Sequence, residues 1–306
     1  MPVAQTPRAA RGTVASLRMT AVRPALRRRE AVRVLDDRDL DEVLGLLAID
    51  PVANAVVAAR VEAARTLDGT RLGGDVVGVG DPGQLCAAAF CGGNLLPVGG
   101  DFGSWTVLGR HLANRRRACS SIVGPASAVA ILWPSLSRRW GTARMIRASQ
   151  PLLVTDRLPT LPIDPAVRPA DFGDVGRYLP AAFAMFEEEL GLTPTDSADR
   201  PGYRVRLTQL IAAGHALVRL DDRGAVIFKA ELAAVVVQCC QVQGVWVRPD
   251  LRGRGIGTAA MAAVLDYALR LAPRVSLYVN DFNYPARRLY ERLGMRQIGT
   301  LSTVLF

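Results

Sequence analysis

A glycine-rich turn follows an apolar, β-rich stretch in the last quarter of the chain. It has the pattern RxxGxG and consists of Arg252, Gly253, Arg254, Gly255, Ile256 and Gly257. Glycines let the backbone approach a ligand closely, and the unpaired N–H groups that start the next helix point outward. Such a turn is suited to a phosphate or pyrophosphate. The chain contains no Gly-Lys-Ser/Thr, and the spacing differs from the dinucleotide fingerprint GxGxxG.

A second motif begins at Asn280 and continues through Asn283 into a predicted helix over 285–293. Pro285 is typical of a helix start, and Gly294 of a position just beyond a helix end. Ala286, Leu289, Tyr290 and Leu293 recur at helical spacing, which places Tyr290 on the buried face. A tyrosine there is either part of the core or a proton donor, because a phenol with a pKa of about 10 is protonated at neutral pH.

Several carboxylates could act as a general base. Glu231 lies in an otherwise apolar strand, where burial could raise its pKa. Lys229 is two residues away on the same strand face, so an ion pair between the two is an equally weighted alternative. The run Glu187, Glu188 and Glu189 supplies second candidates, although three adjacent glutamates usually form a solvated helix face.

Taken together, the turn, the strand ending in Asn280 and the NxxAxxLYxxxG helix resemble the GNAT superfamily of acyl-CoA-dependent N-acetyltransferases. The resemblance covers roughly residues 167–306. The wider pattern, including Gln-Val-Gln-Gly-Val-Trp-Val at 241–247 and a terminal Thr-Val-Leu-Phe, is similar to a two-domain bacterial GNAT group whose amino-terminal half is a domain of unknown function. Met295 departs from the family, which usually has phenylalanine after this glycine.

The resemblance implies transfer of an acetyl group from acetyl-CoA, as co-substrate, to a primary amine by direct attack in a ternary complex. Backbone N–H groups would hold the pyrophosphate at Arg252, Gly253, Arg254, Gly255, Ile256, Gly257 and Thr258. The pantetheine arm would lie along Val245, Trp246 and Val247, and Asn283 would lie near that arm. Tyr290 would protonate the departing thiolate. No metal is implied, and the acceptor is a small molecule or a protein.

The rest of the chain indicates two α/β (α+β) units. With 306 residues, 50% of them apolar, the chain is long enough for two cores. We expect a basic disordered tail at 1–30, an amino-terminal α/β domain at 31–155, and a GNAT domain at 166–306 with a mixed sheet and flanking helices. Between the two domains lies a proline-rich connector. In both halves helices precede a strand meander and then strand, helix, strand, helix, which indicates a diverged duplication and a degenerate GNAT-like first lobe.

Charge and cysteine content exclude several classes of protein. Residues 1–30 hold seven arginines against Glu30, so six of the ten net positive charges lie there. That composition also occurs in transit peptides. No aromatic residues alternate with the arginines as in nucleic-acid readers, so we do not expect nucleic acid as a partner. No apolar run approaches the roughly 18 residues of a spanning helix, so we do not expect a membrane either. Five cysteines without a CxxC pair, and only His111 and His215, indicate no disulfide framework or metal site and favour a cytoplasmic location.

Two other functions fit the same motifs. A tandem GNAT similar to mycothiol synthase would have this length, and a non-catalytic acyl-CoA-binding regulatory protein would need only the turn. The amino-terminal half shows no RxxGxG turn. If it is GNAT-like, we expect it to have lost cofactor binding.

Overall fold

The computed structural model describes residues 31–191 and 200–306, so the tail predicted for 1–30 lies outside the described residues. The elements of the first half are β1 (Val32–Val34), η1 (Asp37–Asp39), α1 (Leu40–Ile49), α2 (Ala55–Ala64), α3 (Gly69–Leu72), β2 (Gly74–Val79), β3 (Ala87–Gly92), β4 (Asn94–Gly99), α4 (Phe102–Ala113), β5 (Ser121–Pro125), α5 (Ala126–Trp140) and β6 (Met145–Thr155).

The second half repeats this order. Its elements are β7 (Arg168–Pro169), η2 (Phe172–Asp174), α6 (Val175–Leu190), α7 (Arg200–Ala212), β8 (Ala216–Leu220), β9 (Val226–Val236), β10 (Cys239–Val247), η3 (Pro249–Leu251), α8 (Ile256–Leu269), β11 (Val275–Tyr278), α9 (Tyr284–Arg292) and β12 (Arg296–Leu305). Apart from α3 in the first half and η3 in the second, each element of one half has a counterpart in the other, as a duplicated α/β unit predicts.

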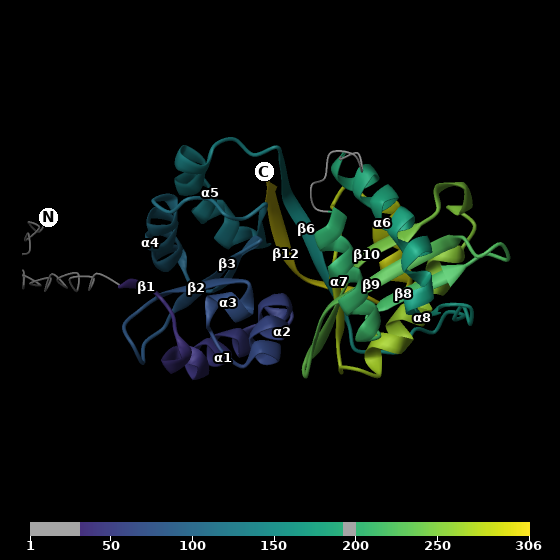
Figure 1. The fold of residues 1–306 in the computed structure, drawn as a ribbon, viewed down its shortest axis with the longest axis horizontal. Coiled ribbons are helices and arrows are strands. Elements are labelled where there is room, and N and C mark those ends of the chain that lie inside the picture. Colours follow the sequence, from purple (N-terminus) through teal and green to yellow (C-terminus); the bar gives the residue numbers. More distant parts are fainter. Residues whose placement is uncertain (1–30, 192–199) are drawn as a thin grey trace, which may run out of the picture.

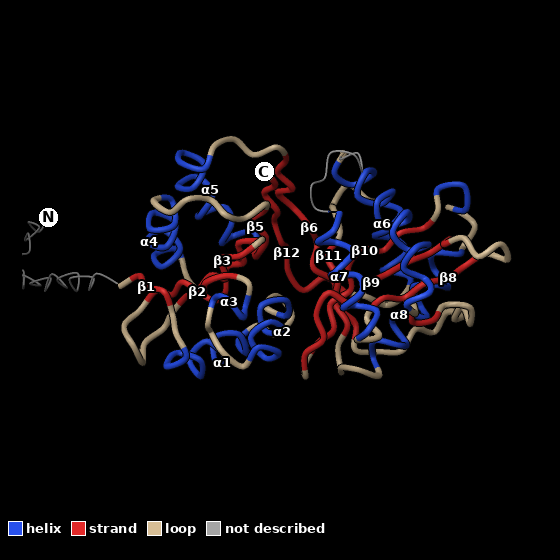
Figure 2. Tube along the Cα trace, in the orientation of Figure 1, coloured by secondary structure: helices blue, strands red, loops and turns tan. Residues whose placement is uncertain are grey.

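One continuous sheet runs through both halves, in the order β1-β2-β3-β4-β5-β12-β6-β11-β10-β9-β8-β7. The order is symmetric about its centre: the last strand of the first half, β6, pairs with β11, and the last strand of the second half, β12, pairs with β5. All three pairings around the centre are antiparallel. The two halves have thus exchanged their final strands, which lie side by side between them (Figures 1 and 2).

Helices cover both faces of this sheet. In the first half, α1 and α2 pack on one face and α4 and α5 on the other. In the second half, α8 and α9 bury an apolar face against β9, β10 and β11, while α6 and α7 pack on the opposite face around Tyr178 and Trp246. The tip of the β9–β10 hairpin, with Val236 and Cys239, joins the core of the first half beneath α2.

Two local expectations from the sequence are wrong. The sequence of residues 32–64 predicts a helical segment, but residues 32–34 form a strand that pairs with β2. Pro151, the first of the prolines that indicate a connector, instead lies inside the eleven-residue strand β6. Pro151 is tolerated inside this central strand beside an irregularity in β12, where the register shifts between Gln297 and Gly299.

Candidate functional site

The RxxGxG turn opens α8 without a side-chain cap. Gly255 is the N-cap residue, at φ 81°, and Gly253 has φ 74°. Side chains rarely adopt these values, which explains both glycines. A Cβ atom at either position would meet nothing within 4 Å. Among the described residues, no acceptor is shown for the N–H groups of Arg254, Gly255, Ile256 or Gly257. The turn is therefore an open cradle of unpaired donors at the positive end of a 14-residue helix.

Gly257 serves a different purpose. A Cβ there would lie 3.1 Å from Cγ2 of Val247 and 3.4 Å from Cδ1 of Leu289. The small residue lets α8 approach the end of β10 and the side of α9 closely.

The equivalent position in the first half is closed. Helix α4 begins with a capping box in which Asp101 accepts from the Ser104 N–H and Ser104 accepts from the Asp101 N–H. A Cβ on Gly100 would lie 2.5 Å from the Trp105 ring, and one on Gly99 2.5 Å from Leu46. A negative side chain and a filled space thus occupy the place where α8 presents free donors.

Strands β10 and β11 separate next to the cradle. They pair in parallel only at Cys240–Val275 and Gln241–Ser276, whereas β10 continues to Val247. On its other side, β10 bulges: the register with β9 shifts between Gln243 and Trp246. Gly244 lies in the bulge at φ 60°. A Cβ there would lie 3.0 Å from Nζ of Lys229. Within the described residues, no strand therefore pairs with the far half of β10 on the side of β11.

The side chains of this edge alternate between the two faces of the sheet. Val245 and Val247 pack towards α8 and α9, and Trp246 packs into the core under α6. Nε1 of Trp246 donates to Oε1 of Glu188 at 3.1 Å. The Arg252 guanidinium donates to the Val247 carbonyl at 2.9 Å and pairs with Glu188 at 2.6 Å. Glu188 of α6 therefore contacts both β10, through Trp246, and the RxxGxG turn, through Arg252. The guanidinium of Arg252 lies against the end of β10.

Tyr290 is buried on α9, 6% exposed, as its helical spacing predicts. The structure shows no hydrogen-bond partner for its hydroxyl among the described residues. Burial raises its pKa, and the Glu189 carboxylate adds to the rise. Asn283 caps α9 by accepting from the Ala286 N–H at 3.3 Å. It therefore fixes the start of the helix that carries Tyr290.

Glu231 forms a buried ion pair with Lys229, with Nζ and Oε1 2.8 Å apart and the side chains 0% and 3% exposed. Tyr203 also donates to Oε1, at 2.8 Å, and the Gln243 amide donates to Oε2 at 3.3 Å. Desolvation acts to raise the pKa of Glu231, but the charge and hydrogen bond of Lys229 and the hydroxyl of Tyr203 outweigh it. The pKa is lowered, opposite to the rise that burial alone predicts.

The three adjacent glutamates of α6 have different surroundings. Glu188 is paired as described. Glu189 is exposed to solvent, yet the protein around it raises its pKa mainly through desolvation, against the opposing charges of Arg147 and Lys229. Its carboxylate acts on the pKa values of both Tyr290 and Tyr278. Arg147, on β6 of the first half, donates to the Glu189 carbonyl at 2.6 Å.

Tyr203, Gln243 and Arg147 are side chains of this region that sequence reasoning missed. Tyr203 and Arg147 reach it from segments distant in the chain, and no local motif marks them. Gln243 lies inside the motif strand at the position paired with Glu231, which only the strand register reveals.

Comparison with family models now identifies the second half. Residues 183–295 match the model described as "Acetyltransferase (GNAT) family". They form a GNAT domain. Residues 74–178 match a second model, described as "Domain of unknown function (DUF4081)". The expected pairing of a GNAT domain with an amino-terminal domain of unknown function is confirmed.

A curated relative supports the GNAT domain. An uncharacterized N-acetyltransferase of Methanocaldococcus jannaschii is 38% identical over 61 residues, which are 20% of this chain and 27% of that protein. The chain thus matches about a quarter of that relative's length.

Solved structures share the fold over both halves. An acetyltransferase of the GNAT family from Colwellia psychrerythraea has a TM-score of 0.54 at 10% identity, covering 90% of this chain and 99% of that one. A GCN5-related N-acetyltransferase from Sphaerobacter thermophilus has a TM-score of 0.56 at 20% identity, covering 90% and 95%. A tandem GNAT protein from the clavulanic acid biosynthesis pathway has a TM-score of 0.52 at 14% identity, covering 89% and 98%. The GNAT fold therefore extends beyond residues 183–295.

Within residues 31–191 and 200–306, no three His, Cys, Asp or Glu side chains lie close enough together to bind a metal ion. No helix in this part of the chain has the length and apolarity to span a membrane.

Proposed function

We propose that the chain is an N-acetyltransferase that moves the acetyl group of acetyl-CoA to a primary amine. The observation that carries the proposal is the open turn at the start of α8, where the N–H groups of Arg254, Gly255, Ile256 and Gly257 have no acceptor among the described residues. Backbone donors at a positive helix end suit a pyrophosphate. Their place at the end of β10, beside the separation from β11, gives the pantetheine arm an edge along Val245, Trp246 and Val247.

The residues around that edge suit direct transfer. The amine nitrogen attacks the acetyl carbonyl carbon, a C–N bond forms, and the C–S bond breaks. Backbone N–H groups of β10, at Val247 in our proposal, receive the negative charge that develops on the carbonyl oxygen. The departing thiolate takes a proton from Tyr290, whose raised pKa keeps the phenol protonated. No covalent enzyme intermediate is needed.

The attacking amine must lose a proton, and two carboxylates compete for this role. Glu231, the first candidate from the sequence, is held by Lys229 and Tyr203 and has a lowered pKa, which makes it a weak base. Glu189 is open to solvent, has a raised pKa and interacts electrostatically with Tyr290. We therefore place the proton-accepting role on Glu189, directly or through a water molecule, and a structural role on Glu231.

The first half has a supporting role in this proposal. Its counterpart of the cradle is capped by Asp101 and filled by Trp105 and Leu46, which supports a single acetyl-CoA site in the chain. The symmetric sheet and the tandem GNAT neighbour support the tandem architecture. The domain boundary between residues 155 and 166 stays a prediction. A cytoplasmic location of the protein also stays a prediction.

Calorimetric titration of acetyl-CoA into the purified chain tests the proposal. We expect micromolar binding, lost in Gly255→Asp because the new carboxylate would lie where the pyrophosphate binds. Gly73→Asp is the matched control, since Gly73 also has a left-handed φ of 75° and no neighbour within 4 Å of a Cβ, but lies in the first half. Equal binding by wild type and Gly255→Asp would mean that the turn is only structural. Binding without acetylation of any amine would favour a regulatory acyl-CoA-binding protein.

A further inference from the structure

Charge is unevenly distributed along the first half. Residues 102–155 contain eight arginines and no aspartate or glutamate, whereas at the chain's average frequency a segment of that length would contain about five acids. Outside this segment and residues 1–30, the chain has a net charge of −4. A general preference for arginine over lysine does not explain the missing acids. The positive charge is therefore local to α4, β5, α5 and β6.

The arginines of this segment fall into two groups. Some have partners: Arg115 pairs with Asp75, Arg117 stacks on Phe306 at 4.3 Å, and Arg147 bonds to Glu189. Four others are exposed and have no ion pair within the described part of the chain: Arg116 after α4, Arg110 on α4, and Arg138 and Arg139 on α5. The last three lie on facing helices.

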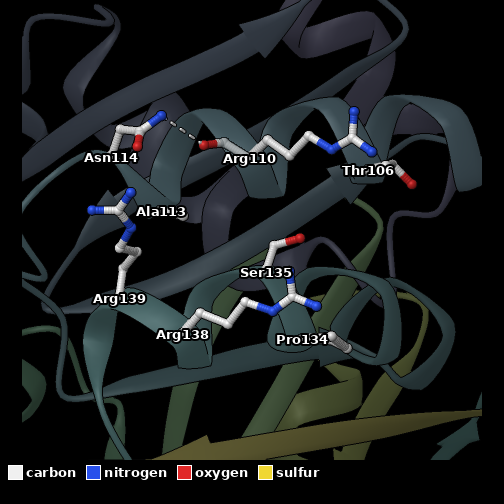
Figure 3. A pocket seen from close by; sticks show the side chains of 8 residues that line it. All are labelled: Thr106, Arg110, Ala113, Asn114, Pro134, Ser135, Arg138 and Arg139. Carbon is white, nitrogen blue, oxygen red and sulfur yellow. Dashed lines mark hydrogen bonds between the residues drawn. The ribbon is translucent and has the colours of Figure 1, made fainter.

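These three guanidinium groups border one groove between α4 and α5. The helices approach closely at Gly109, where a Cβ would lie 3.4 Å from that of Ser135. The groove has a volume of about 420 Å³ and is lined by Thr106, Arg110, Ala113, Asn114, Pro134, Ser135, Arg138 and Arg139. Figure 3 shows Arg110 extending along α4 towards Thr106, with Arg138 and Arg139 on the facing helix. The Ser135 hydroxyl lies between Arg110 and Arg138, and Thr106 and Asn114 line the two ends of the groove (Figure 3).

Helix ends alone do not balance this charge. Arg110 and Arg138–Arg139 lie in the last turns of their helices, where a cation offsets the negative end of the helix dipole. Each helix end carries roughly half a negative charge, so two ends offset about one of the three guanidinium charges. An excess positive charge remains in the groove, with no carboxylate of the segment to neutralise it.

We propose that the α4–α5 groove binds a small molecule carrying a di- or triphosphate group. Guanidinium groups bind phosphate oxygens in bidentate fashion, and several of them around one groove suit a group with several charges. The neutral hydroxyl and amide groups can bond to the remainder of such a ligand. The site belongs to the half that lacks an open cradle, and it is separate from the turn at the start of α8.

Equilibrium binding of inorganic pyrophosphate and of ATP to the full chain tests this site. The Gly255→Asp variant serves as the background, so that binding at the acetyl-CoA turn does not contribute. We expect both probes to bind, more tightly at low salt, and Arg138→Ala/Arg139→Ala to weaken each by about tenfold or more. The matched control is Arg157→Ala/Arg223→Ala, which removes two exposed arginines elsewhere and should leave the affinities unchanged.

Three results would overturn the proposal. One is the absence of binding by either probe at low salt. The second is binding that both double variants weaken equally, which indicates attraction to net charge alone. The third is tight binding of a short single-stranded oligonucleotide without binding of pyrophosphate or ATP, which makes the groove part of a nucleic-acid surface. None of these readouts depends on acetyl transfer, so failure of this site and failure of the proposed enzyme are distinguishable.

Discussion

At the scale of single residues, burial decides which groups can exchange protons. Tyr290 and Glu231 are both nearly inaccessible, but their surroundings differ: no acceptor is shown for the Tyr290 hydroxyl among the described residues, whereas Glu231 has three donors. Desolvation without a partner keeps the phenol protonated, and a neighbouring ammonium keeps the carboxyl ionised. The first is suited to donating a proton, and the second to holding other groups in place.

Tyr290→Phe should lower turnover by about 10²-fold or more while leaving acetyl-CoA affinity nearly unchanged, because only the proton donor is removed. Steady-state kinetics and calorimetry on the same preparation measure both quantities. Tyr278→Phe is the matched control, since Tyr278 lies near the same Glu189 carboxylate and has no role in the proposed reaction. Wild-type turnover in Tyr290→Phe would remove Tyr290 as the proton donor.

Glu189→Gln and Glu231→Gln should fail in different ways. Glu189→Gln should lower turnover by about 10²-fold or more and leave stability nearly unchanged. Its activity should also no longer rise with pH, because that rise comes from a base of raised pKa. Glu231→Gln should lose about 3–5 kcal/mol of unfolding free energy, because Lys229 is left buried and unpaired.

Urea unfolding and pH–rate profiles separate these effects. The folded pKa of Glu231 is below its unfolded value, so the stability it contributes is present above the unfolded pKa and is lost as pH falls through the folded one. Lys229→Met/Glu231→Leu removes both charges and should recover most of the stability. If Glu189→Gln has the same pH–rate profile as the wild type, then Glu231 or water acts as the base.

At the scale of elements, the ends of helices distinguish the two halves. At the start of α4, the Asp101 carboxylate accepts from the Ser104 N–H and the Ser104 hydroxyl accepts from the Asp101 N–H, whereas no described side chain caps α8. Helix α9 is capped by Asn283, which the resemblance to the family placed near the pantetheine arm. As a cap, the Asn283 side chain accepts from the Ala286 N–H, whereas the proposed role is a contact with the pantetheine arm. The two roles can be tested separately.

Asn283→Asp should keep the helix cap, and Asn283→Ala should cost about 1 kcal/mol of stability. If Asn283 acts only as a cap, both variants should bind acetyl-CoA as wild type does. Thermal unfolding together with calorimetric titration measures the two properties. Weaker binding by Asn283→Asp at unchanged stability would place the side chain against the ligand.

Much of the element order could be predicted from the sequence, and the reasons are local. The turn at 252–257, the helix over 285–293 and the buried face with Tyr290 follow from glycine, proline and apolar spacing within a few residues. Strand β6 could not be predicted, because Pro151 inside it indicates a connector and because its partners, β11 and β12, are far away in the chain. Likewise, the Lys229–Glu231 ion pair could be predicted, because both residues lie on one face of a strand. The Tyr203 hydroxyl that also donates to Glu231 could not.

At the scale of the whole molecule, the exchanged strands join two lobes into one structure. Leu301 of β12 is 4% exposed and packs in the core of the first half, together with α1 and α2. Leu152 and Val154 of β6 lie in the same core. The two lobes therefore share apolar contacts across their common strands, and unfolding one lobe exposes part of the other.

Leu301→Ala should cost about 2–5 kcal/mol and lower a single unfolding transition that includes both lobes. Calorimetry with acetyl-CoA present and absent detects whether the ligand shifts the whole transition. Ile298→Ala, at a position 40% exposed on the same strand, should have little effect. Two separate transitions, with only one moved by Leu301→Ala, would mean that the lobes unfold independently.

The pairing of β5 with β12 also sets an order of events during synthesis. On the ribosome, the first lobe emerges with its own helices and strands, but one edge of β5 has no neighbour until residues 301–305 have been made. An unpaired strand edge on a nascent chain is open to pairing with other chains. Translation of the second lobe thus prolongs the exposure of the first, and chaperones that cover strand edges should be needed for longest while residues 126–300 are being added.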